Sequence, residues 1–171
     1  MAAIIRRRLL PLAKAAGLYQ PLDADLTAIA ALATTSFGRS LLTLADAAAA
    51  RSALDIVTGT YTPTLTNVSN LSASTAVVTG YLRVNDMVVV AGKFQADAVA
   101  AASTSTQMGM SLPIASALTA AEQLGGTALQ ASGRQPIELN GDATNDRANF
   151  FWVSQSTANE NISFIFMYRI I

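Results

Sequence analysis

Residues 75–99 read TAVVTGYLRVNDMVVVAGKFQADAV, and this stretch decides the fold of the chain. Two runs rich in valine and other residues that favour strands flank Asn85-Asp86, and both of these residues tolerate the left-handed backbone of a tight turn. Because side chains alternate between the faces of a strand, each run offers one face to a core. The candidates for these faces are Val78, Gly80, Leu82, Val84, Val88, Val90, Gly92 and Phe94, or the residues that alternate with them. The stretch therefore predicts an antiparallel hairpin.

The sequence on either side of the hairpin continues in Thr, Val, Ser, Asn and Gly, with short apolar runs between them. Pro63 cannot donate to a ladder, so the run TYTPTLT at 60–66 indicates an edge strand. We expect a polar loop at 102–107, and either a loop or one helical turn at 116–123. Further strands are expected at 108–114, stopped by Pro113, at 125–129, around Ile137 and Leu139 up to Asn140-Gly141, at 147–155 and at 161–171.

The last two expected strands carry most of the large aromatic residues. These are Phe150, Trp152, Phe164, Phe166 and Tyr168, and they stand at alternating positions. Alternation directs them to one side, which favours a core or a subunit interface over a platform for stacking sugars. Residues 58–171 are therefore predicted to form one domain, an antiparallel β-sandwich or jelly-roll-like head.

The composition changes near Val57, because residues 21–57 are rich in Ala and Leu. Asp23 or Asp25 is expected to cap a helix over Leu26–Ala33, which residues 34–38 would end. A second helical stretch is expected from Ser40, with Asp46 as a cap for the residues that follow. Helices this short are marginal alone in water and need a partner surface, which we expect to be neighbouring copies of the chain. The candidate packing residues are Leu26, Ile29, Leu41, Leu44 and Leu54.

Residues 1–20 form a basic and apolar leader, MAAIIRRRLLPLAKAAGLYQ. The arginine cluster divides its apolar residues, so it does not resemble a signal peptide, and no apolar run in the chain approaches the roughly 20 residues that span a bilayer. The leader indicates either a docking peptide that anchors the subunit to a larger assembly or a disordered segment. The candidate anchoring residues are Ile4, Ile5, Arg6, Arg7, Arg8 and Leu9.

The composition of the 171 residues excludes several classes of function. The 11 basic and 11 acidic side chains balance, which argues against nucleic acid and membrane as partners. The absence of His and Cys removes the usual general base, the thiolate nucleophile and the commonest metal ligands, so we expect no enzyme and no cofactor. Charged residues make up only 13% of the chain. This predicts either a surface rich in Thr, Ser and Asn or a surface largely buried between identical subunits.

Carboxylates remain as possible catalytic groups. Glu138 with Asp142, or Asp142 with Asp146, could form the pair that glycoside hydrolysis needs, but they stand in or near a segment rich in Gly and Asn that is typical of a solvated turn. The segment NGDATND also lacks the spacing of a calcium loop. We expect its side chains, and those of two other polar loops, to contact sugar hydroxyls instead. The candidate contact residues are Ser103, Thr104, Gln107, Asn140, Asp142, Asn145, Asp146 and Asn159.

Two segments of the N-terminal region, LDADLTAIAAL at 22–32 and FGRSLLTLADAAAARSALDI at 37–56, resemble a module found in tail fibres and related appendage proteins of tailed bacteriophages. Residues 59–171 look like the C-terminal β domain common in phage fibre and virion proteins. Together the resemblance covers about 21–171. It implies a mainly β subunit with a short helical N-terminal region: a leader at 1–20, a stalk or collar module at 21–57 and a head at 58–171, assembled as a homotrimer in the bacterial cytoplasm.

The function that the resemblance implies is a short tail fibre or spike of the virion, whose head adheres to the host cell surface, with a glycan as the possible ligand. Other virion proteins would hold the N-terminus. The alternative is a capsid decoration or head-fibre protein mounted on the shell by its leader. A glycan-cleaving tailspike is the least favoured, since it needs a clear carboxylate pair.

Overall fold

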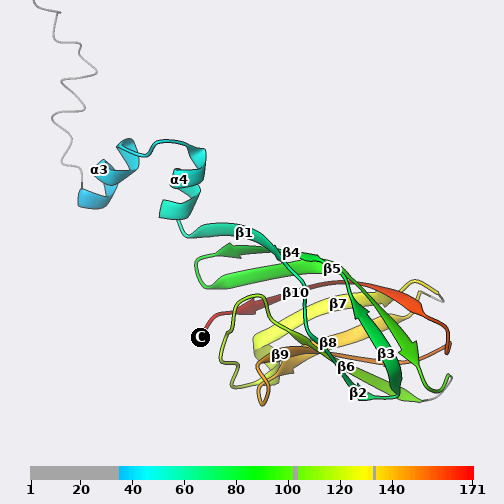
Figure 1. Ribbon diagram of the computed structural model, residues 1–171. Helices are drawn as coiled ribbons and strands as arrows, with labels where there is room; N and C mark the ends of the chain where they lie inside the picture. The colour runs from blue at the N-terminus through cyan, green and yellow to red at the C-terminus, as the bar shows by residue number, and fades with distance from the viewer. Residues whose placement is uncertain (1–34, 102–103, 133) are drawn as a thin grey trace, which may run out of the picture. The chain divides into compact units, whose positions relative to one another are not determined.

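A computed structural model of the chain describes residues 35–101, 104–132 and 134–171 (Figure 1). It divides the chain into two units, residues 1–44 and residues 45–171. The described part is mainly β, with an antiparallel curled sheet and two short helices near its N-terminal end. The leader at 1–20 and the expected helix at Leu26–Ala33 lie outside the described residues.

The helix α3 (Ser36–Leu42) belongs to the first unit, and its start differs from the expectation. Thr35 is its N-cap, and the Thr35 hydroxyl accepts a hydrogen bond from the Gly38 backbone N–H at 3.1 Å. Because this bond satisfies one of the free N–H groups of the first turn, residues 35–38 begin a helix rather than end one.

The helix α4 (Ala47–Ala53) opens the second unit with the cap that the sequence predicts. The helical stretch expected from Ser40 is not continuous, because residues 43–46 separate α3 from α4. Asp46 is the N-cap of α4, and the Asp46 carboxylate accepts a hydrogen bond from the Ala49 N–H at 2.8 Å. The chain then enters the sheet at Ile56, two residues before the expected boundary at Thr58.

The sheet has ten strands, and each pair of neighbours is antiparallel. The strands are β1 (Ile56–Tyr61), β2 (Leu65–Ser69), β3 (Leu71–Ala76), β4 (Thr79–Val84), β5 (Met87–Ala98), β6 (Ser105–Ser111), β7 (Leu124–Gln130), β8 (Pro136–Asp142), β9 (Arg147–Val153) and β10 (Glu160–Arg169). Their order across the sheet is β1-β4-β5-β10-β7-β8-β9-β6-β2, and β3 pairs with the second half of β5. The expected hairpin is confirmed, since β4 and β5 pair with Val84 opposite Met87, and Asn85 in the turn has a φ of 53°.

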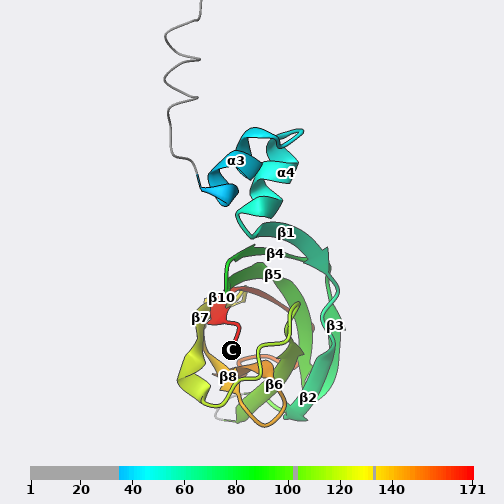
Figure 2. The ribbon, with the colours of Figure 1, turned by 90° about the vertical axis from the view of Figure 1, so that its left-hand side faces the viewer.

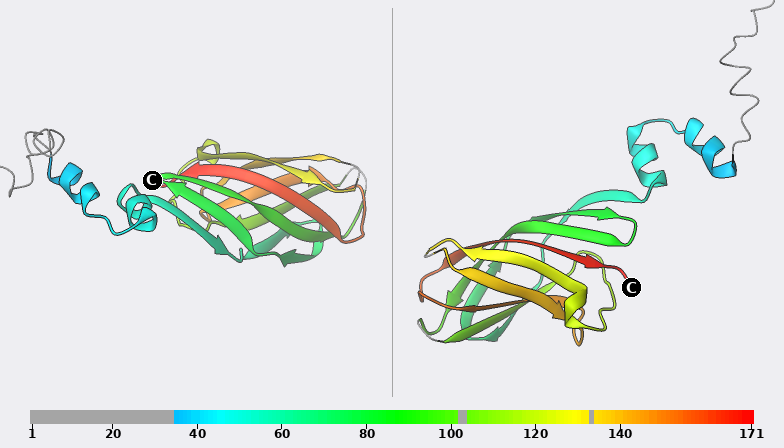
Figure 3. Two further views of the ribbon diagram at one scale, coloured as in Figure 1. Left: turned by 90° about the horizontal axis from the view of Figure 1, so that it is seen from above. Right: turned by 180° about the vertical axis from the view of Figure 1, so that it is seen from behind.

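The sheet curls so that β2, at one end of the strand order, approaches β3, which pairs with β5 near the other end. β2 follows β6 at one end of the order, yet Asn67 of β2 accepts a hydrogen bond of 2.6 Å from the Ser74 hydroxyl of β3. Seen along the strands, the sheet forms a ring around one interior (Figure 2). The two further views show the same curl from above and from behind (Figure 3). Strands β1, β4, β5 and β10 therefore lie on one side of this interior, and β8, β9, β6 and β2 lie on the other (Figure 1).

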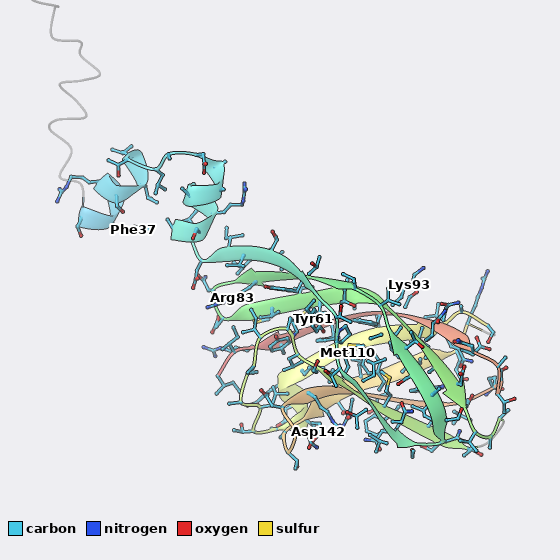
Figure 4. The ribbon with its side chains drawn as sticks, viewed as in Figure 1. Phe37, Tyr61, Arg83, Lys93, Met110 and Asp142 are labelled. Atoms are coloured by element: carbon cyan, nitrogen blue, oxygen red, sulfur yellow. The ribbon has the colours of Figure 1, made fainter. Side chains whose placement is uncertain are left out.

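The interior holds the aromatic core that the sequence predicts. Phe150, Trp152, Phe164, Phe166 and Tyr168 are all buried there. Phe94 joins them from the confirmed core face of β5, and its ring meets that of Phe150 edge to face with centroids 5.1 Å apart. Met108 and Met110 of β6 fill the opposite wall, and Figure 4 shows Met110 inside the sheet while Lys93 projects from its outer side. Burial of these large side chains is the main source of stability for the domain.

Strand β4 turns the other way from the face first considered for it. Thr79 is buried and Tyr81 packs against the core, so these alternates face the interior. Val78, Leu82 and Val84 are exposed on the outer side instead. The alternation of β4 was therefore predicted, but Thr79 and Tyr81 face inward in place of Gly80, Leu82 and Val84.

Two expected boundaries of strands are wrong, one in the run at 60–66 and one in the loop at 102–107. The run at 60–66 is not one strand, because buried Pro63 lies in a break between β1 and β2. Proline lacks the N–H that a ladder needs, so it separates two strands, and the expected edge character is confirmed because β1 and β2 stand at the two ends of the order. The loop expected at 102–107 ends earlier, because β6 begins at Ser105. The buried Thr106 hydroxyl accepts a hydrogen bond from the Asn70 side chain at 2.7 Å, so its burial in the strand leaves no unsatisfied polar group.

A third boundary differs at Asn140-Gly141, where the sequence predicts the end of a strand. β8 continues through Gly141 to Asp142, and the turn follows at residues 143–146. A Cβ on Gly141 would lie 3.1 Å from the Ala121 carbonyl oxygen and 3.2 Å from Leu118, so this glycine admits a neighbouring segment against the strand. That segment includes a 3₁₀ turn, Ala121–Gln123, which settles the alternative left open for 116–123.

Candidate functional site

The outer surface of β8, β9 and β6 carries polar side chains, and we call it the polar face. Adjacent strands lie about 4.8 Å apart, so the residues that pair across them form rows of neighbours. One row places Phe151 of β9 between Glu138 of β8 and Gln107 of β6. The next row places Val153 beside Ser105. An aromatic ring flanked by a carboxylate and an amide is thus built into the sheet itself.

A shallow hollow of about 540 Å³ lies over this part of the polar face. Its wall includes Ser105, Gln135, Glu138, Phe151 and Val153. Phe151 is partly exposed and Glu138 is exposed, whereas Phe150 and Trp152 on either side of Phe151 point into the core. The Gln135 Oε1 is buried and accepts no hydrogen bond from the described residues, which leaves one acceptor unsatisfied at the wall. Apolar ring, carboxylate, amide and hydroxyl together suit a ligand with hydroxyl groups and an apolar flank, such as a sugar.

The hollow lies at one end of the sheet, away from the turn Asn85-Asp86. Ile170, which follows β10, donates from its N–H to the Asp86 carbonyl at 2.7 Å, and Ile171 donates to Ser116 at 3.0 Å. Ser116 in turn donates from its N–H to the Asp146 carboxylate, so the turn 143–146 lies at this same hairpin end. Ser105 and Val153 stand at the far ends of their strands from Ser111 and Arg147, and the hollow is therefore at the opposite end.

Asp142 and Asp146, two of the predicted contact residues, are engaged inside the protein. The Asp142 carboxylate accepts from Arg147 Nε and Asn145 Nδ2, each at 2.8 Å (Figure 4 labels Asp142). Burial alone would raise the pKa of Asp142, but these hydrogen bonds outweigh it and hold the pKa below its ordinary value. The carboxylate therefore fixes the β8–β9 turn.

The Asp146 carboxylate fixes the neighbouring loop. It accepts from the backbone N–H of Ser116 at 2.9 Å and of Leu118 at 3.0 Å. Here too burial would raise the pKa, and the backbone hydrogen bonds outweigh it and lower the pKa of Asp146. Asp146 has a φ of 49°, a left-handed conformation that Asp adopts more readily than most residues. Its geometry is that of a structural clamp.

Of the two carboxylate pairs considered from the sequence, Glu138 with Asp142 does not have catalytic geometry. Glu138 and Asp142 lie four residues apart on one strand, which separates their Cα atoms by about 13 Å, whereas glycosidases hold their two carboxyl groups roughly 5–9.5 Å apart. Within the described ranges, no group of three or more His, Cys, Asp or Glu residues is placed to hold a metal ion.

The remaining predicted contact residues divide between the two ends of the sheet. Thr104 and Asn159 directly precede β6 and β10 at the end that holds the hollow, and Gln107 lies on the polar face beside Phe151. Asn140 lies further along β8 on the same face, and Asn145 lies in the turn at the hairpin end. Ser103 is outside the described residues.

Sequence reasoning missed Phe151 and Gln135 as wall residues of a hollow, and it identified Ser105 only as part of the expected polar loop at 102–107. The signal for Phe151 was present in the alternation of β9, because Phe150 and Trp152 facing the core require Phe151 to face outward. Gln135 and Ser105 carried no such signal, since their positions depend on the pairing of strands distant in sequence.

The predicted trimer-packing residues are not buried within the chain. As far as the described residues go, neither α3 nor α4 buries a side chain. Leu54 is 47% exposed, Phe37 is 53% exposed and Leu42 is 73% exposed. Leu41 and Leu44 are partly exposed, and Leu26 and Ile29 lie outside the described residues. Helices this short, with their apolar side chains in contact with water, lack the packing that normally stabilises a helix.

Comparison with known proteins finds no matching protein-family profile, no matching curated protein and no matching solved structure. In the part of the chain that the structure describes, no helix is long and apolar enough to cross a membrane.

Proposed function

We propose that the chain is the subunit of a short trimeric fibre or spike of a bacteriophage virion, and that its β domain adheres to a glycan of the host cell surface. The observation that carries the adhesive part is the open hollow with Glu138 and Phe151 in its wall, and Gln107 beside Phe151 in the same row. The resemblance of residues 21–56 to a phage appendage module supports the setting. In this account the two sides of the curled sheet act as the two layers of a sandwich-like head around the aromatic core.

The trimeric collar in this proposal rests on the helices. α3 and α4 are well capped, yet neither buries a side chain within its own chain. Association of three copies would cover Leu41, Leu44 and Leu54, which removes apolar surface from water. Tertiary packing, rather than helix propensity, normally stabilises segments of this length.

Glycan binding fits the chemistry of the hollow better than catalysis does. On either side of the Phe151 ring, which supplies an apolar contact, the Glu138 carboxylate accepts from hydroxyls and the Gln107 amide both donates and accepts. A shallow site binds weakly, but three sites on one fibre raise the avidity by roughly 10² or more where the geometry permits simultaneous contact. The Asp142 and Asp146 carboxylates already bind protein donors, so we propose no hydrolytic activity.

The test is binding of the purified protein to host cells and to an array of bacterial surface polysaccharides. Phe151→Ala and Glu138→Gln are each expected to lower binding at least tenfold at unchanged thermal stability, because both side chains face outward from the sheet. Thr58→Ala, an exposed position on β1, is the matched control and should bind as the parent protein does. Equal binding by all four proteins would refute the site.

Imaging of intact particles separates the tail fibre from the capsid-mounted alternative. An antibody to the β domain, applied to intact particles and imaged by electron microscopy, should label the tail. Label on the shell would assign the subunit to the capsid and leave the adhesive hollow to be judged by the binding data alone.

A further inference from the structure

The outer surface of β4, β5 and β10 differs from the polar face because its side chains are apolar. We call this surface the apolar face. Strand pairing places Leu82 beside Val89 and Val89 beside Met167, which makes one apolar row. The adjoining row consists of Gly80, Ala91 and Ile165. At the hairpin end the pair of Val84 and Met87 extends the surface.

The side chains of the apolar face are open to solvent in the single chain. Leu82, Val84, Met87, Ile165 and Met167 are between 39% and 50% exposed. Together they present on the order of 400 Å² of apolar surface, as large as the biggest such patches on typical monomers. The inward side chains of the same strands, such as Val90 and Phe166, are completely buried. A strand that is apolar on both faces is typical of a sheet covered on both sides.

The apolar face is also shaped to receive side chains. Above Gly80 lies a hollow of about 290 Å³, with Leu82, Val89 and Ala91 in its wall. A Cβ added to Gly80 would meet nothing within 4 Å, so the glycine leaves open space that its own chain does not fill. Ile165 and Met167, on the neighbouring strand, stand out beside this space. The face therefore carries both a hollow and the protruding side chains that would fit one.

We propose that the apolar face packs against further copies of the same chain and forms the subunit interface of the β domains. This inference rests on the trimer of the proposed function and extends it from the helices to the sheet. The rows named above contain no charged side chain apart from Arg169 at the end of the Met87 row, and Asp86 already pairs with Arg169. Lys93 follows in the next row of β5 and marks the polar edge of the face. Between Arg169 and Lys93 the face is apolar, so an identical apolar face complements it better than a charged partner does.

A second copy of the chain would cover both the exposed Leu54 of α4 and the apolar face of the sheet. The uncovered Leu54 at the end of α4 directly precedes β1, and Ile56 of β1 pairs with Val84 of the apolar face. Ile56 therefore extends the apolar face beside Val84, and Leu54 lies two residues before Ile56 in the chain. The roughly 400 Å² of the face is about half of the ~800 Å² that a standard interface buries per partner. Packing of α4 in the same interface supplies further area.

The absence of cysteine from the chain permits a direct test. Met167→Cys introduces a single thiol on the apolar face, and Thr66→Cys introduces one at an exposed position on β2, distant from that face in the strand order. The rate of reaction with a soluble thiol reagent is measured in the full-length protein, together with its mass by light scattering. We expect the thiol of Met167→Cys to react at least tenfold more slowly than that of Thr66→Cys, and at the same rate in denaturant.

The mass of the particle in solution shows how each rate of thiol reaction is to be interpreted. Protection of Met167→Cys in a particle of several chains is the expected result. Fast reaction in a particle of several chains would overturn the inference and leave the trimer intact. Protection in a particle of one chain would show that the chain covers its own face, and would overturn both the inference and the trimer.

Gly80→Arg provides a second variant that does not disturb the fold, since the position has open space around it. Combined with Met167→Cys, it should fill the hollow, separate the β domains and raise the rate of thiol reaction at least tenfold. The matched combination with Thr66→Arg should leave the rate unchanged. A rate that Gly80→Arg does not alter would contradict the packing proposed here.

Discussion

At the scale of the residue, Phe151 and Trp152 are neighbours in sequence with opposite roles. Trp152 is 7% exposed and packs in the core, whereas Phe151 lies on the polar face under the hollow. Trp152→Ala is expected to lower the free energy of unfolding by about 3–5 kcal/mol through loss of burial and a residual cavity. Phe151→Ala should lower it much less and lower glycan binding instead.

Chemical denaturation and cell binding of the two variants check this division. A Trp152→Ala protein that folds with normal stability and loses binding would mean that the inward and outward sides of β9 have been exchanged in this account.

Asp146 carries a prediction about acid stability. Its pKa is lowered in the folded protein, so its carboxylate contributes fully to stability above the ordinary pKa near 3.9 and loses that contribution as the pH falls through the lower folded value. Asp146→Asn keeps one acceptor and tolerates the left-handed backbone, but has no charge to lose. We expect it to cost about 1–2 kcal/mol at neutral pH.

Urea denaturation at neutral pH and again well below pH 4 measures this effect. The difference between Asp146→Asn and the parent protein should shrink toward zero in acid, because both side chains are then uncharged. A difference that stays constant with pH would show that the lost charge is irrelevant.

At the scale of the element, the β4–β5 hairpin depends on the backbone of Asn85. Asn85 has a φ of 53°, and its N–H donates to the Asp55 carbonyl at 3.1 Å. A β-branched side chain is strained in this conformation by roughly 1–2 kcal/mol, whereas glycine adopts it freely. We therefore expect Asn85→Val to lower the midpoint of thermal unfolding and Asn85→Gly to leave it nearly unchanged. Calorimetry that ranks the two variants in the reverse order would contradict the assigned turn.

Elements defined by local signals could be predicted from the sequence. Asn85-Asp86 marked the hairpin, Asp46 marked the start of α4, and alternating aromatics marked the core faces of β9 and β10. The errors arose where distant segments decide the outcome. Thr106 enters strand β6 because the Asn70 side chain satisfies its hydroxyl, and Gly141 stays in β8 because the segment around Leu118 and Ala121 packs against it.

The candidate site was less predictable than the fold for the same reason. Polar residues were identified as contacts by composition, but composition does not distinguish Asp142 and Asp146, which bind protein donors, from Glu138, which is free to face solvent. The hollow itself depends on the pairing of β6, β8 and β9, which no local pattern encodes.

At the scale of the whole molecule, the separation of a polar and an apolar face on one curled sheet suggests how a subunit would be used. In the proposed function, the apolar face would meet other copies and the polar face would remain outward to meet a glycan. Because the charged carboxylates near the turn are engaged in structure, incubation of the protein with bacterial surface polysaccharide should release no new reducing ends. Release that disappears in Glu138→Gln would replace adhesion by hydrolysis as the function.

The central claim is that the subunits assemble in threes, and the mass of the purified full-length protein in solution tests it most directly. Multi-angle light scattering at micromolar concentration should give the mass of three 17.8 kDa chains, and the value should hold on dilution to the lowest measurable concentration. A stable particle with the mass of a single chain would contradict the account, because the apolar side chains of the helices and of the apolar face would then remain in water.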